Sequence, residues 1–343
     1  VDAQTGTNVA QADMTLEGAE ITVRYYKGSY TEDDLRSEDA PAPERTWILK
    51  TDEDGVSLLL ESYKVGGDEL YKLGGRPYLP LGTVTVQETK APQGYELDPT
   101  VYVCHFTPDE SGRKWISFDM TATIPQAQVM GGVGIRKVDA EEGTASPRGA
   151  ASLDGATFAI YNASEHDVTV DGTVYTPQTL EDVQAGTAQA IMTIEAHDGA
   201  ATTDTDGNGA DASLPFGTYY LREVASGNGY LLDDTVRTVE VREAGAVAWC
   251  EDACANQVIR GDIAFDKVYE DTKAGVAFLV ESATTHEHHV VVTDATGHVD
   301  TSAAARSHTH RTNTNDAVWD AATGTVDEAL LDADAGLWFY GNT

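Results

Sequence analysis

The stretch LPLGTVTVQETKAPQGY at residues 79–95 returns at residues 214–230 as LPFGTYYLREVASGNGY. Leu-Pro-x-Gly-Thr, the glutamate and Gly-Tyr all recur at one constant offset of 135. Near the starts of the same regions, VDAQTGT at 1–7 matches VDAEEGT at 138–144, at an offset of 137. Similarity at a fixed spacing indicates tandem copies of one domain.

Three copies account for the 343 residues: 1–130, 131–260 and 261–343. The third copy opens with GDIAFDKV at 261–268, which is similar to GGVGIRKV at 131–138. A Thr-Asp-x-x-Gly turn signal recurs at 51–55, 203–207 and 293–297. The third copy lacks the Leu-Pro-x-Gly-Thr stretch, so we expect it to be truncated or divergent.

Composition favours an all-β protein and excludes several partners. Short alternating runs rich in Val, Thr and Tyr, separated by Gly and Asp turns, are typical of strands. The sequence has 57 acidic and 22 basic residues, which gives a net charge of −35. This charge argues against nucleic acid and anionic lipid as partners. Apolar runs are too short for membrane insertion, and with no charged-then-apolar leader we expect a mature or excised fragment.

The three cysteines are too few for a disulfide framework. Cys250 and Cys254 flank a three-residue turn, and the sequence leaves open whether they form a local disulfide in an oxidising setting.

Charged residues recur on apolar strand faces. Alternate residues of a strand share a face, so each of these runs ends an apolar stripe with a charge: Val84-Val86-Glu88, Tyr219-Leu221-Glu223, Val133-Ile135-Lys137 and Ile263-Phe265-Lys267. A charge that faces a core is costly unless it is paired or neutralised. A neutral lysine is a nucleophile and a neutral glutamic acid is a proton donor. Beside an asparagine, such a pair can displace ammonia from the side-chain amide, and Asn256 lies in ANQVIRGD near the end of copy two.

ETKAPQGY at 88–95, the spacing from Gly-Thr-Tyr to Glu and Gly-Tyr, and the strand NQVIRGDI resemble the Cna B-type (prealbumin-like) repeat domains of Gram-positive collagen adhesins and pilins. The resemblance implies tandem β-sandwich domains of immunoglobulin-like shape on a sortase-anchored, extracellular cell-wall protein. It also implies an intramolecular isopeptide bond in copy two between Lys137 and Asn256, assisted by Glu223. The expected function is a structural stalk or shaft of an adhesin or pilus-like protein, a monomer without cofactor, and no enzyme apart from one self-crosslinking turnover.

Copies one and three depart from this pattern. By the offset of 137, the lysine of copy one would directly precede Val1, and the alignment of AQVMGG with NQVIRG places Ala127 in the asparagine position, with Gln126 adjacent. Glu88 therefore has no matching lysine and asparagine in the pattern of copy one, and we expect no isopeptide bond there. Copy three has the matching Lys267 but no recognisable glutamate segment.

An alternative function is a module that binds a host extracellular-matrix protein or glycan through the inserts at 27–46 and 298–335. Histidines cluster near the end of the chain, and His286, His288, His308 and His310 are weak metal candidates. We expect a polar surface there and no metal site. No hydrolase, phosphate-loop or dinucleotide motif occurs.

Overall fold

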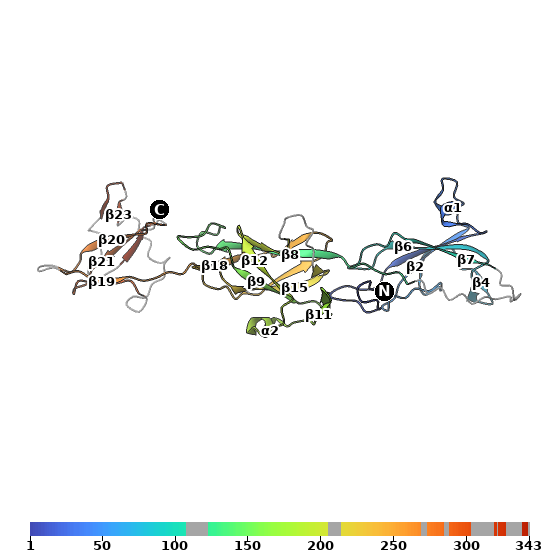
Figure 1. The fold of residues 1–343 in the computed structure, drawn as a ribbon, viewed down its shortest axis with the longest axis horizontal. Helices are drawn as coiled ribbons and strands as arrows, with labels where there is room; N and C mark the ends of the chain where they lie inside the picture. Colours follow the sequence, from blue (N-terminus) through green and yellow to red (C-terminus); the bar gives the residue numbers. More distant parts are fainter. Residues whose placement is uncertain are drawn as a thin grey trace. The chain divides into compact units, whose positions relative to one another are not determined.

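The computed structural model describes residues 1–107, 123–204, 214–268, 273–284, 288–302, 319–320, 322–326 and 338–341. Strands dominate this part of the chain, and its helices are α1 (Glu32–Arg36) and α2 (Leu180–Ala185) (Figure 1). The predicted all-β class is confirmed.

The structure divides into two compact units, which are described separately. Unit 1 comprises Val1–Lys137, Asp154–Ser226 and Leu232–Cys254, and unit 2 comprises Val138–Leu153, Gly227–Leu231 and Ala255–Thr343. The division runs through two strands and does not follow the repeat, so the boundaries at 130 and 260 remain predictions.

Copy one contains a five-stranded antiparallel sheet in unit 1. Its strand order is β3 (Lys64–Gly67), β2 (Arg45–Lys50), β1 (Glu20–Tyr26), β6 (Gly82–Lys90) and β7 (Val101–Phe106). Trp47 and Val84 are buried beneath it, and Tyr71 packs edge-on against Trp47. A short hairpin, β4 (Lys72–Leu73) with β5 (Arg76–Pro77), projects beside the sheet.

Most of copy two belongs to one nine-stranded sheet. Along its main path the strands are β14 (Leu214–Pro215), β8 (Met130–Asp139), β13 (Ala200–Thr202), β12 (Met192–His197), β9 (Thr157–Asn162), β15 (Gly217–Ala225) and β16 (Arg237–Val241). β17 (Val247–Trp249) and β18 (Cys254–Asn256) also pair with β8. Strands β6 and β15 occupy the same positions of the repeat, at the offset of 135.

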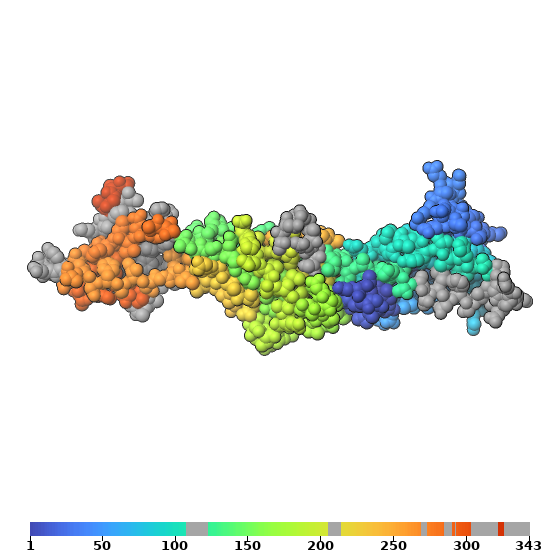
Figure 2. Space-filling view, viewed as in Figure 1, coloured from blue at the N-terminus to red at the C-terminus, as the bar shows by residue number. Residues whose placement is uncertain are grey.

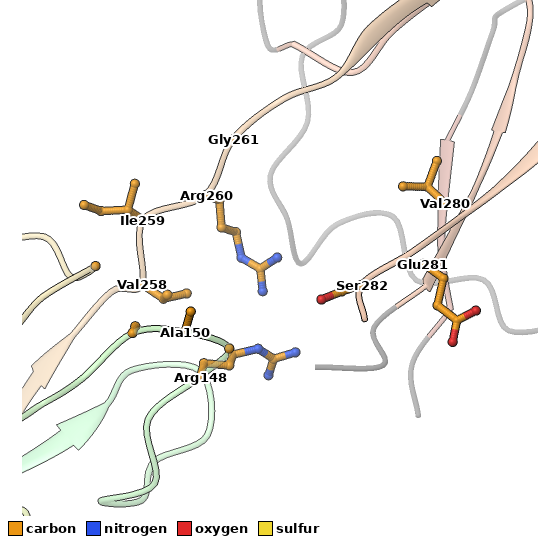
Figure 3. A pocket seen from close by; sticks show the side chains of 12 residues that line it. Arg148, Ala150, Val258, Ile259, Arg260, Gly261, Val280, Glu281 and Ser282 are labelled. Atoms are coloured by element: carbon orange, nitrogen blue, oxygen red, sulfur yellow. The ribbon is translucent and has the colours of Figure 1, made fainter. Parts of the chain in front are cut away.

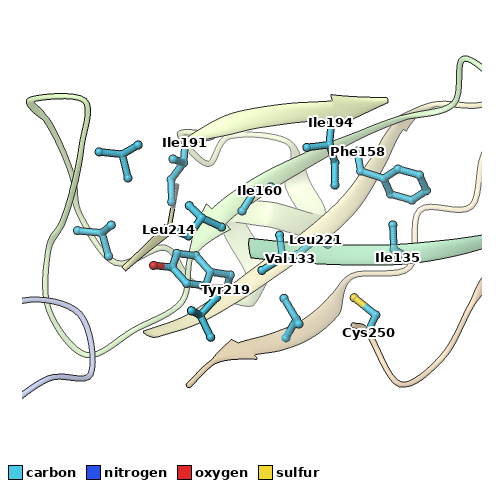
Figure 4. Close-up of a cluster of buried hydrophobic side chains, with 14 of the residues drawn as sticks. Val133, Ile135, Phe158, Ile160, Ile191, Ile194, Leu214, Tyr219, Leu221 and Cys250 are labelled. Carbon is cyan, nitrogen blue, oxygen red and sulfur yellow. The ribbon is translucent and has the colours of Figure 1, made fainter. Parts of the chain in front are cut away.

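The core of copy two is formed by the alternating apolar faces of these strands (Figure 4). Val133, Ile135, Phe158, Tyr219 and Leu221 have no exposed surface. Burying each such side chain is worth about 1.5–3 kcal/mol. Gly134 permits the close packing of β17, because a Cβ there would lie 2.8 Å from the Trp249 ring.

An N-terminal segment of copy one packs against copy two within unit 1. Ala12 and Met14 belong to the same buried cluster as the copy-two core. The Ala12 amide donates to the Asp167 carbonyl, beside the hairpin of β10 (Val168–Val170) and β11 (Thr173–Tyr175). Asp13 accepts from Thr218 and forms an ion pair with Arg242. Figure 2 shows this N-terminal segment, in dark blue, against the yellow-green atoms of copy two.

In unit 2, β19 (Ala264–Asp266) pairs with β22 (His298–Asp300), and β21 (His288–Val292) lies between β20 (Ala277–Glu281) and β25 (Trp338–Gly341). A short hairpin joins β23 (Trp319–Asp320) and β24 (Thr325–Val326). Phe265 and Phe278 meet edge to face on a small core of Val291 and Val299.

Two of the predicted Thr-Asp-x-x-Gly turns have one hydrogen-bond pattern. In each, the aspartate amide donates to the carbonyl of the residue four positions on, and the glycine amide donates to the aspartate carbonyl. These turns are at Asp52–Val56 and Asp294–His298. The turn after Thr203 extends outside the described residues.

Candidate functional site

A buried ion pair lies where β8 and β15 meet the core of copy two. The Nζ of Lys137 is 3.0 Å from the Oε1 of Glu223, and neither side chain has exposed surface. Alternation places both there, because Lys137 follows Val133 and Ile135 on one face and Glu223 follows Tyr219 and Leu221. The predicted inward orientation of this lysine and this glutamate is confirmed.

The second oxygen of Glu223 is held by the backbone. The Asp233 amide donates to Oε2 of Glu223 at 2.7 Å. The carboxylate of Asp233 is itself fixed by Arg237 at 2.7 Å and by the Thr235 amide. Burial alone would raise the pKa of Asp233, but the hydrogen bonds from Thr235 and Arg237 outweigh it and lower this pKa to about 2.

Cys254 borders the ion pair. Its Sγ lies 3.5 Å from Nζ of Lys137 and 3.5 Å from Oδ2 of Asp233. Burial raises the pKa of this thiol to about 12, and that of Cys250 to about 11. Neither of these cysteines belongs to a disulfide in the structure, so the candidate disulfide between them is not formed. Cys254 is the first residue of β18, and its thiol is turned toward the ion pair. This orientation accounts for the absence of the candidate disulfide.

Asn256 is the last residue of β18, two positions after Cys254. Its side chain is 1% exposed, and its Nδ2 donates to the Leu231 carbonyl at 2.8 Å. Its backbone carbonyl accepts from the Ala140 amide. β18 pairs with β8, the strand that carries Lys137.

A buried aspartate–tyrosine contact, which sequence reasoning missed, anchors the beginning of copy one and of copy two. In copy two the Tyr230 hydroxyl donates to Asp139 at 2.7 Å, and in copy one the Tyr95 hydroxyl donates to Asp2 at 2.9 Å. Both aspartates are fully buried. The signal was present in the sequence, since the aspartate belongs to the repeated VDA and the tyrosine to the repeated Gly-Tyr.

Copy one keeps the glutamate but changes the amide. Glu88 is 1% exposed, and the Asp98 amide donates to its Oε2 at 2.8 Å, as Asp233 does to Glu223. The carbonyl of Gln126 accepts from the Ala3 amide, as that of Asn256 does from Ala140. The asparagine position of copy one is therefore held by Gln126, and its assignment to Ala127 was wrong by one residue. The alignment ran through Gln-Val, and the chain between the glutamate and the last strand differs in length between the copies.

The lysine stripe of copy three is not a core stripe. Ile263 is 40% exposed, and Phe265 and Lys267 are half-buried. The Lys267 Nζ lies 5.8 Å from the centre of the Phe278 ring, a cation–π distance. The expectation of a buried face at 263–267 is therefore wrong for the described residues, because the small core of this copy leaves Ile263 uncovered.

The histidine candidates fall largely outside the described residues. His286, His308 and His310 lie there, and of His288 only the backbone, in β21, is described. Within the described part of the chain no three metal-ligating side chains cluster. No helix there is long and apolar enough to cross a membrane.

Other surface features are weaker sites. The insert at 27–46 carries helix α1, which begins with a capping box between Thr31 and Asp34.

In unit 2 a pocket is lined in part by Arg148 and Arg260 (Figure 3), and both arginines pair with Glu141. Their charge is thus directed to a carboxylate of the chain itself.

The tandem all-β domains of copies one and two, whose strands recur at a constant offset, are consistent with β-sandwich domains of a prealbumin-like class. Residues 4–118 and 131–252 match the SpaA prealbumin-like fold domain, so the chain belongs to this family.

Solved structures with which the chain shares similarity include the Bacillus anthracis TIE protein, at 18% identity and a TM-score of 0.45, over 84% of this chain and 40% of that one. The minor pilin GBS52 of Streptococcus agalactiae matches at 14% identity and a TM-score of 0.24, over 75% of this chain and 88% of that one. A C-terminal fragment of the pilus adhesin SpaC from Lactobacillus rhamnosus GG matches at 13% identity and a TM-score of 0.30, over 71% of this chain and 90% of that one. No curated protein matches the chain.

Proposed function

We propose that the chain is a structural region of a Gram-positive surface adhesin or pilus-like protein, and that copy two locks itself with an isopeptide bond between Lys137 and Asn256. The observation that carries the proposal is the fully buried Lys137–Glu223 pair. Membership of the prealbumin-like family supports the structural role and is consistent with the proposed location on the cell wall.

Burial supplies the reactive form of the lysine. Neither ion of the pair is solvated, so transfer of one proton from Nζ of Lys137 to Oε1 of Glu223 removes two buried charges in one step. The products are a neutral amine, which is a nucleophile, and a neutral carboxylic acid, which is a proton donor. The Asp233 amide keeps the carboxyl in place throughout.

The electrophile is the side-chain amide of Asn256. Cys254 and Asn256 share one face of β18, about 7 Å apart along the strand, and Cys254 Sγ is 3.5 Å from the lysine nitrogen. A Nζ–Cγ bond forms as the Cγ–Nδ2 bond breaks, and the proton lost by the amine reaches Nδ2 through Glu223. Ammonia leaves beside the Leu231 carbonyl, which already accepts a hydrogen bond from Nδ2. Folding brings the amine, the acid and the amide together in advance, and this proximity lowers the activation barrier of the reaction.

The bond would join the first strand of copy two to its last. A pulling force on the chain would then pass through covalent bonds and bypass the hydrogen-bonded sheet. The closed loop also restricts the unfolded chain, as a disulfide does, by about 3–5 kcal/mol.

Single-molecule stretching of the full chain tests this function. In the wild type, the segment between Lys137 and Asn256 should contribute no extension at any force that leaves covalent bonds intact. The variant Asn256→Ala should release this segment, at about 3.5 Å for each residue. Equal extension of the two chains would contradict the proposal.

A further inference from the structure

Asp13 of copy one carries a carboxylate that is held by copy two, within unit 1. The Glu165 amide donates to its Oδ1 at 3.0 Å, and the Thr218 hydroxyl donates to its Oδ2 at 2.6 Å. Both terminal nitrogens of Arg242 also donate to Oδ2, each at 3.2 Å. The Asp13 side chain is only 17% exposed, so these donors replace most of its water. Hydrogen bonds to an ionised group are about twice as strong as those between neutral groups.

The loop that carries Asp13 is also bound through the residues before it. The Ala12 carbonyl accepts from the His166 amide at 3.1 Å. The Gln11 side-chain oxygen accepts from the Thr169 amide at 3.0 Å. Because hydrogen bonds are directional, these contacts fix the position of the loop along copy two as well as its distance from it.

An apolar contact lies beside the carboxylate. Met14 and Phe216 are 3% and 5% exposed, and both lie against Gly94, where an added Cβ would be 2.4 Å from Met14 and 3.1 Å from the Phe216 ring. The Arg242 guanidinium lies 4.5 Å from the centre of the same ring, a cation–π distance. Exclusion of water from this contact strengthens the neighbouring interaction between the carboxylate and the arginine.

Copy one does not repeat this arrangement in its described residues. The registers of β6 with β7 and of β15 with β16 place Thr107 at the position of Arg242. Thr83, the counterpart of Thr218 at the offset of 135, donates its hydroxyl to the Gly28 carbonyl of copy one itself. The group that attracts a carboxylate is therefore particular to copy two, which makes the contact specific.

From these contacts we infer that copy two carries a docking site for an aspartate-bearing loop, and that residues 11–14 of copy one occupy it and couple the two copies into one cooperative unit. The docking site consists of Glu165–Thr169, Phe216, Thr218 and Arg242. Its ligand is a carboxylate side chain on a loop whose next residue is apolar. The inference goes beyond the proposed function, because it concerns the joint between two copies and does not need the isopeptide bond.

Hydrogen exchange of the full chain tests the docking site, since the amides of Glu165, His166 and Thr169 donate across it. Asp13→Asn keeps the shape of the side chain and removes its charge. We expect these three amides to exchange on the order of ten-fold faster, because hydrogen bonds to a charged group are the stronger ones. Exchange in β1 and β2 should stay unchanged. The control is Glu17→Gln, which removes an exposed charge from the same segment and should change neither.

Arg242→Gln removes the other charge and should accelerate the same amides. Because both residues act on one contact, the double variant should exchange within about two-fold of either single variant. Independent effects would multiply to on the order of 100-fold and would overturn the coupling. Unchanged exchange in Asp13→Asn, or equal acceleration in Glu17→Gln, would overturn the docking site.

A second variant separates loss of docking from loss of folding in copy one. Should Asp13→Asn also accelerate exchange in β1 and β2, Thr218→Val decides, since it removes one donor to the carboxylate and leaves the sequence of copy one intact. Faster exchange of the three reporter amides in Thr218→Val would support the docking site, and exchange at the wild-type rate would contradict it.

Discussion

The nitrogen of the Lys137 side chain lies 3.0 Å from a carboxylate oxygen of Glu223, and neither side chain has any exposed surface. Burial of two charges costs several kcal/mol for each ion, and the attraction between them repays this cost only in part. The pair is therefore weak evidence for stabilisation by itself. The crosslink proposed for copy two would use this pair together with the asparagine on strand β18, which pairs with β8.

Replacing the acid while keeping its shape should prevent the crosslink. In Glu223→Gln the glutamine cannot take a proton from Lys137, so we expect copy two to retain Asn256 intact. Loss of the closed loop should lower its free energy of unfolding by about 3–5 kcal/mol. Hydrogen exchange of the β9 and β15 amides as a function of denaturant measures this change.

The matched control is Glu88→Gln in copy one, which is the same substitution at the equivalent position. It should leave exchange in β9 and β15 unchanged. A Glu223→Gln chain that still shows wild-type protection in copy two would argue against the acid–base role.

Glu88→Gln should stabilise copy one at neutral pH. Burial raises the pKa of Glu88 in the folded state, and the unfolded value is about 4.3. The protonated carboxyl therefore contributes stability that is fully present below about pH 4.3 and is lost as the pH rises through the folded pKa. The neutral glutamine avoids this loss.

Hydrogen exchange of β1 and β6, measured from acid to neutral pH, gives the comparison. The advantage of Glu88→Gln over the wild type should grow with pH. A constant difference, or a wild type that is the more stable chain at pH 7, would contradict the raised pKa.

Asp233 should make copy two sensitive to acid. The hydrogen bonds and the Arg237 ion pair that outweigh burial lower its pKa to about 2, below the unfolded value of about 3.9. Its contribution is thus present above about pH 3.9 and is lost as the pH falls through about 2. Asp233→Asn should flatten the stability profile of copy two between these values in urea titrations. The exposed Asp234→Asn is the control, and an equal effect of both substitutions would count against this assignment.

The thiols of Cys250 and Cys254 should be inert in the folded protein. Burial raises their pKa values to about 11 and about 12, so almost no thiolate exists at pH 8. We expect alkylation of Cys104, which is partly exposed, to precede alkylation of these two, which should react only on unfolding. Rapid alkylation of Cys254 in the native chain would show that the crosslinking site is open to solvent.

The alternation of apolar residues and the internal repeat correctly predicted the strands and the residues that face the core. Tyr219, Leu221 and Glu223 are buried as their spacing indicates, and β6 and β15 coincide across the repeat. The prediction that Ala127 fills the asparagine position failed because an insertion or deletion between repeats shifts register without leaving a mark in a short motif. Backbone pairing, with Gln126 opposite Asp2, resolves it.

Other features depend on tertiary contacts that no pattern encodes. Ile263 has the spacing of a core residue, yet it is 40% exposed, because the described part of copy three builds only a small core. The contact of Asp139 with Tyr230 joins residues 91 positions apart. Its two halves were visible in the sequence only as separate repeated motifs.

The intact mass of the full chain, followed by peptide mapping, tests the central claim most directly. The wild type should weigh one ammonia less than its calculated mass, and a tryptic digest should contain a branched peptide that joins Lys137 to Asn256. The variant Asn256→Ala should have its full calculated mass and yield the two peptides separately. A wild-type chain at its full calculated mass, with Lys137 and Asn256 in separate peptides, would contradict the account.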